Sequence, residues 1–194
     1  MTTDVQICSK LKSPSYDDDM IIHLHVGTMF SGKTTSLSAT YPDYLHITHT
    51  YATDDDPNIH KSDTLDLDDD EFVQMMLSGG VIIDEVQFFS PEILFQFINT
   101  CQMLGVDIHL SGLDYDYLRN EWPTITMLKA KYGDNLEEIH HDRLCARCKK
   151  YIAIYTARIN TSEKKIILTD KSYYLPVCVK CYDEMMISNE IVYY

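Results

Sequence analysis

The chain has 194 residues, of which 45% are hydrophobic and 24% are charged, and its formal net charge is −14. The length suits one domain with, at most, a small appended domain, and the composition is ordinary for a globular protein. The acidic balance argues against a general nucleic-acid or anionic-membrane surface, and no apolar run approaches the ~20 residues of a membrane span. Six cysteines without a signal-peptide pattern predict a reducing compartment, where metal ligation is favoured over disulfides.

A glycine-rich loop follows the first predicted strand. The run from Met20 to Val26 is predicted to form that strand, and Lys33 to Ala39 the start of a helix. Between them, Gly27 to Thr34 match the phosphate-binding pattern G-x-x-x-x-G-K-T, in which successive backbone N–H groups converge on one anion; a chance glycine turn is the alternative. Lys33 is expected to reach the β- and γ-phosphates, and the Thr34 hydroxyl to bind Mg²⁺. The predicted phosphate-binding residues are Gly27, Thr28, Met29, Phe30, Ser31, Gly32, Lys33, Thr34 and Thr35.

Further strands and helices alternate along the chain. The sequence predicts strands over Tyr44 to Tyr51, Val81 to Glu85 and Val106 to Leu110, and helices over Glu71 to Leu77, Ser90 to Leu104 and Thr124 to Lys131. The Asp-rich stretch from Ala52 to Asp70 is either a plain solvated loop or a lid. The alternation predicts an α/β fold of the P-loop NTPase type, with a parallel sheet and helices on both of its faces.

Two acids end the most hydrophobic of these strands. Asp84 has the position of the carboxylate that holds Mg²⁺ beside a P-loop, at the sheet edge where open α/β folds bind ligands. Its neighbour Glu85 is suited to take a proton from a substrate hydroxyl as that hydroxyl attacks the γ-phosphate. The structural alternative is that one of the two acids only caps the following helix.

Aromatic side chains follow the predicted strand ends. Phe88, Phe89, Tyr117 and Trp122 offer rings against which a flat heterocycle would stack, although each of them taken alone is more typical of a core. The Gln87 amide both donates and accepts hydrogen bonds, and so it is suited to recognise the edge of a base.

The C-terminal part contains two Cys-x-x-Cys pairs. Four thiolates are the ligand set of a structural Zn²⁺ and leave no open position for catalysis; here they are Cys145, Cys148, Cys178 and Cys181. Redox-active pairs are the alternative, and His140 and His141 are alternative ligands or plain surface residues. Cys8 and Cys101 are expected to be free thiols.

The composition changes near residue 142, which suggests three regions. Residues 1–19 are predicted to be a flexible acidic tail, 20–141 a nucleotide-binding domain, and 142–194 a small β-rich zinc-ribbon domain. Inside the ribbon, Tyr151 to Ile159 and Lys164 to Leu168 are predicted to pair as strands, and a short helix is expected after Cys181.

Together these motifs resemble a known family. The chain is similar to the zinc-containing type II thymidine kinases, the cytosolic class that also occurs in bacteria and large DNA viruses. The similarity extends from about Ile21 to Tyr182. The segments that carry it are Gly27 to Thr34, Asp84 to Phe89, Gly112 to Asp114, Tyr155 to Arg158, and Tyr174 four residues before Cys178.

The resemblance implies an activity and assigns roles to residues. The family transfers the γ-phosphate of ATP to the 5′-hydroxyl of thymidine or deoxyuridine, a salvage step for DNA precursors. Glu85 matches its catalytic base, Lys33 and Thr34 the phosphate and Mg²⁺ ligands, and Asp84 the acid that holds Mg²⁺. Positions that match the nucleoside pocket are Met29, Phe88, Leu113, Tyr117, Trp122, Thr156 and Tyr174, to which we add the amide of Gln87.

In the family, a lasso attached to the zinc ribbon closes over the nucleoside and contacts the base through its main chain. The corresponding segment is Lys165 to Tyr174, which implies backbone contacts from Ile166, Ile167 and Leu168. The resemblance also implies a homotetramer, feedback inhibition by thymidine triphosphate and a cytoplasmic location, with no nucleic-acid or membrane partner. This chain departs from the family pattern in its lasso, where Thr169 to Lys171 contain no glycine.

Three other interpretations fit parts of the sequence. A P-loop ATPase or switch would use the ribbon to recruit a protein partner and would hydrolyse ATP without a nucleoside. A deoxynucleoside kinase with altered base preference would keep the chemistry and change the acceptor. A nucleic-acid-binding ribbon would use its basic residues, but the acidity of the chain argues against it; these residues are Arg143, Arg147, Lys149 and Lys150.

Overall fold

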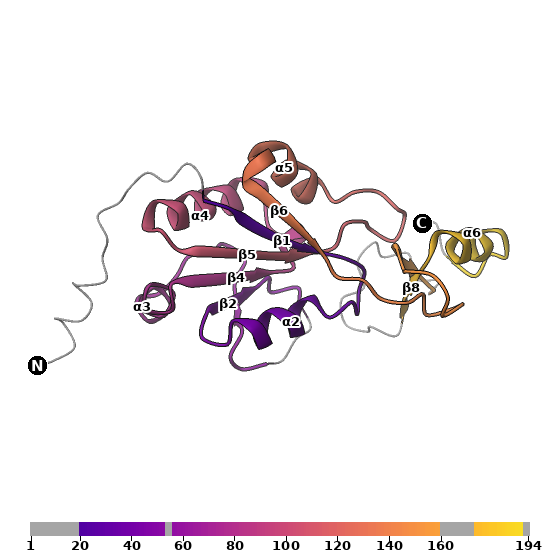
Figure 1. Cartoon of the computed structure of the whole chain (residues 1–194), viewed down its shortest axis with the longest axis horizontal. Helices are drawn as coiled ribbons and strands as arrows, with labels where there is room; N and C mark the ends of the chain where they lie inside the picture. Colours follow the sequence, from indigo (N-terminus) through magenta and orange to yellow (C-terminus); the bar gives the residue numbers. More distant parts are fainter. Residues whose placement is uncertain (1–19, 53–55, 160–172, 192–194) are drawn as a thin grey trace, which may run out of the picture.

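A six-stranded parallel sheet forms the centre of the computed structural model, which describes residues 20–52, 56–159 and 173–191 (Figure 1). The strands follow the spatial order β3-β2-β4-β5-β1-β6, and each neighbouring pair is parallel. Their bounds are β1 (Ile22–Val26), β2 (Leu45–Thr48), β3 (His60–Lys61), β4 (Gly80–Asp84), β5 (Asp107–Gly112) and β6 (Leu136–His140). Because all six run the same way, their carboxyl ends meet at one edge, and the predicted α/β fold is confirmed.

Helices cover both faces of this sheet. α2 (Lys33–Thr40) lies on one side, whereas α4 (Pro91–Leu104) and α5 (Pro123–Tyr132) lie on the other (Figure 1). α3 (Asp69–Ser78) packs beside β2 and β4, and two short 3-10 turns, η1 (Val86–Phe88) and η2 (Gly133–Asn135), complete the connections. Among the described residues, no helix combines the length and the apolar character that crossing a membrane requires.

Local sequence signals explain where two of the helices begin and end. At the start of α4, the Ser90 hydroxyl accepts a hydrogen bond from the N–H of Ile93 at 3.3 Å. The helix ends at Gly105, whose φ of 67° favours glycine. α3 begins with a capping box, in which Asp68 and Glu71 each accept a hydrogen bond from the other's backbone N–H.

The two faces of the sheet carry different side chains. Alternate aliphatic residues of β1, β2, β4 and β5 face α4 and α5, which contribute Leu94, Phe97, Ile98, Cys101, Ile125 and Leu128 to one hydrophobic core. Each fully buried aliphatic side chain of this kind stabilises the fold by roughly 1.5–3 kcal/mol. On the α2 side the same strands present histidines: His23 and His25 from β1, His46 from β2 and His109 from β5.

A small unit follows the sheet. β7 (Tyr155–Arg158) and β8 (Tyr174–Val177) form an antiparallel pair, and α6 (Val179–Ile187) comes directly after them. Its core contains the four cysteines together with Ala157, Val177, Tyr182 and Met185, and it shares no described residue with the core of the sheet. This separation supports a second domain, and the boundary at residue 142 stays a prediction.

Three strands of the structure are missing from the sequence prediction. β3 has only two residues, and β6 is an edge strand whose side chains are all at least partly exposed, so neither has a strong apolar pattern. β8 contains Pro176, which argues against a strand except at an edge. The predicted strand Lys164 to Leu168 lies outside the described residues.

Candidate active site

The P-loop joins the carboxyl end of β1 to α2. Gly27 has a φ of 146° and Gly32 a φ of 87°, values that residues with side chains rarely adopt. A Cβ atom on Gly27 would lie 2.7 Å from the backbone oxygen of His141, so this position requires glycine for space as well. Gly32 turns the chain directly into α2, whose first N–H groups suit an anion.

Lys33 lies buried at the first position of α2. Its Nζ donates to the backbone oxygens of Gly27 at 3.1 Å and Thr28 at 3.0 Å. Burial lowers the pKa of this ammonium group, while the nearby carboxylates of Glu85 and Asp84 act in the opposite direction. The cation is therefore held inside the loop, where phosphate oxygens would be stronger partners than these two carbonyl groups.

Thr34 and Asp84 connect α2 to the end of β4. The Thr34 hydroxyl donates to Asp84 Oδ2, and Asp84 Oδ1 accepts from the backbone N–H of Glu85 at 2.9 Å. Asp84 is only 4% exposed. A hydroxyl and a carboxylate in this arrangement are the protein ligands that hold Mg²⁺ beside a P-loop.

Glu85 has a left-handed backbone conformation, with φ 55° and ψ 41°, which is uncommon for a residue other than glycine. Its carboxylate accepts a hydrogen bond from Gln87 Nε2, and Gln87 Oε1 accepts from the N–H of Leu113 at 3.2 Å. A Cβ atom on Gly112 would lie 2.9 Å from Gln87 Oε1, so glycine makes room for this amide. Gln87 thus orients Glu85, a positioning role that no sequence pattern indicates.

Aromatic side chains gather around the same edge of the sheet. The Phe88 ring meets Trp122 and Tyr51 edge to face, with centroids 5.6 Å and 5.8 Å away. Phe89 instead is 1% exposed and belongs to the main core, so this one of the four candidate aromatics is a packing residue.

The small domain contacts the P-loop directly. The N–H of Met29 donates to Thr156 Oγ1 at 3.1 Å, and Arg143 Nη1 donates to the backbone oxygen of Phe30 at 2.7 Å. We call these two hydrogen bonds the loop–hairpin seam. Thr156 is 4% exposed, so the Met29 bond is shielded from water. The seam brings Met29 and Thr156, two predicted pocket residues from distant parts of the sequence, into contact.

Arg158 lies beside a predicted pocket residue, Tyr117, and no sequence pattern assigns it a role. It lies on the same face of the β7–β8 ladder as Tyr174, is 0% exposed, and places its guanidinium carbon 4.9 Å from the centre of the Tyr117 ring. Within the described part of the chain, none of its three guanidinium nitrogens has a hydrogen-bond partner. A buried cation without hydrogen-bond acceptors is costly. The unpaired Arg158 donors lie beside Tyr117, which is a predicted pocket residue.

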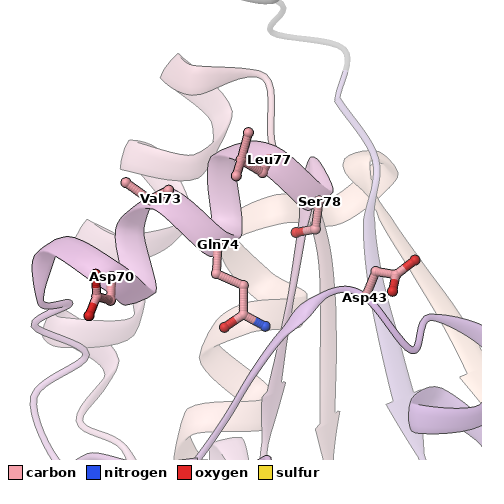
Figure 2. Close-up of a pocket in the computed structure, with 6 residues that line it drawn as sticks. All are labelled: Asp43, Asp70, Val73, Gln74, Leu77 and Ser78. Atoms are coloured by element: carbon pink, nitrogen blue, oxygen red, sulfur yellow. The ribbon is translucent and has the colours of Figure 1, made fainter. Parts of the chain in front are cut away.

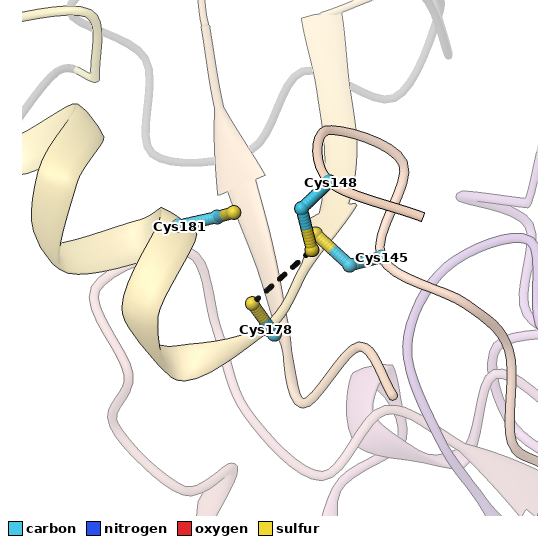
Figure 3. Close-up of side chains that lie close together, drawn as sticks. All are labelled: Cys145, Cys148, Cys178 and Cys181. Carbon is cyan, nitrogen blue, oxygen red and sulfur yellow. Dashed lines mark hydrogen bonds between the residues drawn. The ribbon is translucent and has the colours of Figure 1, made fainter. Parts of the chain in front are cut away.

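The four cysteines of the small domain converge (Figure 3). Cys148 Sγ and Cys178 Sγ are 3.9 Å apart, and the four sulfur atoms all lie within 4.8 Å of one another. Zinc with Zn–S bonds of ~2.3 Å places its sulfurs roughly 3.8 Å apart, so the cluster is consistent with zinc. Burial raises the pKa of the Cys145 thiol, but backbone N–H groups directed at its sulfur outweigh burial and bring the pKa to about 6. At Cys145 the backbone therefore favours the thiolate that a metal binds, whereas burial raises the pKa of the Cys178 and Cys181 thiols.

The alternative zinc ligands His140 and His141 lie outside the cysteine cluster. His140 ends β6, and His141 follows it and contacts His25 at 2.9 Å, so the cysteine cluster is complete without them. Ile166, Ile167 and Leu168, which the resemblance assigns to the base, lie outside the described residues.

An open hollow of about 560 Å³ lies on the other side of the molecule, at the amino ends of β2 and β4 (Figure 2). Asp43 and five residues of α3 line it, namely Asp70, Val73, Gln74, Leu77 and Ser78. It shares no residue with the predicted phosphate or nucleoside positions.

This architecture places the molecule in the class of P-loop α/β proteins, because the phosphate-binding loop follows the parallel strand β1 and faces the acidic end of β4, which is separated from β1 by β5. Comparison with known proteins is more specific. The family model for thymidine kinase matches residues 42–182, and the chain belongs to the thymidine kinase family. The match begins after the P-loop, so the loop adds support that is independent of it.

Individual relatives agree with this assignment. The thymidine kinase of Pseudothermotoga lettingae is 30% identical over 111 residues, which are 57% of this chain and 58% of that protein. The thymidine kinase of Bacteroides thetaiotaomicron is 29% identical over 103 residues, so the chain spans about half the length of these bacterial relatives. The thymidine kinase of Choristoneura fumiferana entomopoxvirus is 27% identical over 184 residues, 85% of this chain and 97% of that protein.

Among solved structures, a large terminase from a thermophilic bacteriophage superposes on 70% of this chain with a TM-score of 0.38 and 13% identity. The superposed part is 44% of the terminase chain, and a similarity this low carries no argument about function.

Proposed function

We propose that this chain is an ATP- and Mg²⁺-dependent kinase that phosphorylates the 5′-hydroxyl of thymidine and so produces thymidine monophosphate. The observation that supports this most is the meeting of Lys33, the Thr34–Asp84 pair and Glu85 at one edge of the sheet. Membership of the thymidine kinase family supplies the acceptor, because the P-loop by itself indicates only a nucleoside triphosphate.

On the donor side, the loop amides and Lys33 would bind the β- and γ-phosphates, and Lys33 would exchange its two backbone acceptors for phosphate oxygens. Thr34 and Asp84 would hold Mg²⁺, which neutralises charge on the phosphates when it is bound. The protein's contribution to the rate is then positioning and electrostatic stabilisation of the transferring group.

On the acceptor side, Glu85 would take the proton of the 5′-hydroxyl as that oxygen attacks the γ-phosphorus. A bond from the 5′-oxygen to phosphorus forms, the bond from the γ-phosphorus to the bridging β–γ oxygen breaks, and ADP leaves. Gln87 holds the Glu85 carboxylate, so the base is already oriented before the substrate arrives.

The nucleoside would occupy the space between the P-loop, the aromatic cluster and the β7–β8 hairpin. Residues proposed to line it are Met29, Gln87, Phe88, Leu113, Tyr117, Trp122, Thr156 and Tyr174, joined by Ile166, Ile167 and Leu168 of the predicted lasso. Support comes from the loop–hairpin seam and from the edge-to-face packing of Phe88 with Trp122. A structural zinc on the four cysteines would hold the hairpin in place. We further propose a homotetramer that is inhibited by thymidine triphosphate.

The test is to incubate the protein with labelled ATP, Mg²⁺ and a panel of nucleosides, and to separate the products. We expect labelled thymidine monophosphate and little hydrolysis of ATP in the absence of a nucleoside. Phosphorylation of another deoxynucleoside in preference to thymidine would change the acceptor. Hydrolysis that is independent of nucleosides, with no labelled monophosphate, would contradict the proposal and support an ATPase.

A further inference from the structure

A second cluster of metal-ligating side chains lies at the amino edge of the sheet, opposite to the P-loop. His23 is the second residue of β1, and Asp107 and His109 are the first and third residues of β5. Register places His23 beside His109 on neighbouring strands, and one ligand atom from each of the three side chains lies within 4.8 Å of the others. His109 is buried, whereas the side chains of His23 and Asp107 are 26% and 37% exposed, so the cluster opens to solvent on one side.

Each of the three side chains is held from behind by another residue. His23 Nδ1 lies 2.8 Å from a carboxylate oxygen of Glu137, and His109 Nδ1 lies 3.1 Å from His25 Nε2. The Tyr44 hydroxyl donates to Asp107 Oδ2 at 2.9 Å. On the inner side, His23 Nε2 lies 3.9 Å from Asp107 Oδ1, and His109 Nε2 lies 3.2 Å from Asp107 Oδ2. Metal-binding histidines and carboxylates are typically oriented by outer hydrogen bonds of this kind.

We propose that His23, Asp107 and His109 form a binding site for Zn²⁺, separate from the four-cysteine cluster and from the catalytic edge. Two imidazoles and one carboxylate are an established zinc ligand set that leaves a fourth position for water. At present the His23 and His109 rings are stacked, with centroids 4.6 Å apart. Zinc binding requires the His23 ring to turn out of this stack, which its exposure to solvent permits.

Zinc at this site would reverse the direction of the hydrogen bonds that link His109, His25 and His141. His109 Nε2 lies 3.2 Å from Asp107 Oδ2 and donates to it, because a carboxylate only accepts. His109 Nδ1 then accepts from His25 Nε2, and His25 Nδ1, 2.9 Å from His141 Nε2, accepts from His141.

Zinc bound to His109 Nε2 displaces the proton on that nitrogen. The ring proton of His109 must then lie on Nδ1, which donates to His25 Nε2. The rings of His25 and His141 change tautomer in turn. One proton leaves at Asp107 and one enters from water at His141 Nδ1, so the rings stay neutral. His141 donates its backbone N–H to Val26 at 2.9 Å, directly before the P-loop. The row of histidines therefore ends at a residue whose backbone adjoins the P-loop.

The test uses full-length protein whose ribbon already contains one zinc per chain, titrated calorimetrically with Zn²⁺ at pH 7.5. We expect uptake of one further ion. Affinity should fall at least tenfold in His23→Gln, which removes a ligand, and roughly tenfold in Glu137→Gln, which removes only an outer partner. Glu137→Gln also covers the case in which a ligand variant fails to fold.

The matched control is His60→Gln. His60 Nδ1 lies 2.7 Å from a carboxylate oxygen of Glu71, so it forms a similar partly exposed histidine–carboxylate pair, and no third ligand joins it among the residues that the structure describes. Its loss should leave zinc affinity unchanged. A wild-type protein that takes up no second ion at micromolar free zinc would overturn the proposal, and so would an equal loss of affinity in His23→Gln and His60→Gln.

A second readout is the nitrogen-15 spectrum of the imidazole rings. Zinc should move the ring proton of His25 from Nε2 to Nδ1 in the wild type and leave it in place in His23→Gln. Zinc uptake with an unchanged His25 tautomer would place the ion elsewhere and contradict the assignment of His109 as a ligand.

Discussion

A single backbone conformation decides where the proposed catalytic base points. Glu85 follows β4 with a positive φ, and this turn directs its carboxylate to Gln87 instead of continuing the strand. Conformations of this kind cost on the order of 1–3 kcal/mol and persist where the surrounding structure enforces them. Here the Gln87 amide, anchored on the N–H of Leu113, provides that support. The position of Glu85 is predictable from the sequence, whereas its orientation is not.

We expect Glu85→Gln to lower kcat for thymidine phosphorylation by at least ~100-fold, because an amide does not accept the 5′-hydroxyl proton. Gln has nearly the same shape, so thymidine binding should remain. Single-turnover kinetics and equilibrium binding of thymidine separate the two effects.

The control for this variant is Glu92→Gln, which removes a carboxylate from the exposed first turn of α4 and should leave kcat unchanged. Glu85→Gln with a kcat near that of the wild type would show that another group accepts the proton.

At the scale of elements, the loop–hairpin seam joins the P-loop to the small domain, through Thr156 of β7 and through Arg143. Two hydrogen bonds form it, one of them between the Met29 N–H and the buried Thr156 hydroxyl. The hairpin is more than a hundred residues away in the sequence, so the seam exists only because the small domain folds back beside the P-loop. Through it, the conformation of the phosphate-binding loop depends on the position of β7.

Thr156→Val should test this dependence. Valine keeps the volume and removes the acceptor, which leaves the Met29 N–H unpaired at a cost of about 1–3 kcal/mol. We expect kcat/KM for thymidine to fall roughly tenfold, since ~1.4 kcal/mol corresponds to a factor of ten.

Thr100→Val is the matched control, because the Thr100 hydroxyl donates to the Gln96 carbonyl on the exposed surface of α4. If Thr156→Val lost thermal stability but kept its kcat/KM, the seam would be structural only.

At the scale of the whole molecule, the two parts are stabilised differently. The sheet domain has a large aliphatic core between β-strands and helices, whereas the core of the small domain consists of the four cysteines and a few neighbours. A unit of that size cannot bury enough apolar surface to fold by itself, so metal binding would supply much of its folding free energy.

Cys181→Ser should therefore abolish binding of the proposed ribbon zinc and reduce thymidine phosphorylation to near background, while the sheet domain keeps its helical circular dichroism and its main thermal transition. Zinc release is measured with a chromogenic chelator. Cys101→Ala, which changes a buried thiol of the other core, should retain zinc and activity. Unfolding of the whole chain in Cys181→Ser would contradict the independence of the two cores.

The sequence by itself determines the class of fold, the P-loop, the acidic strand end and the four cysteines, because these depend on local patterns: apolar runs, glycine spacing, helix caps and ligand spacing. Ser90 and Gly105 mark the ends of α4 for this reason. The tertiary structure alone decides which side chains meet. Thr156 on the P-loop, Arg158 over Tyr117 and the row of histidines join residues that are far apart in the sequence, and the Gln87 amide behind Glu85 is anchored on the distant Leu113. Such contacts depend on strand order and register, which no local periodicity encodes.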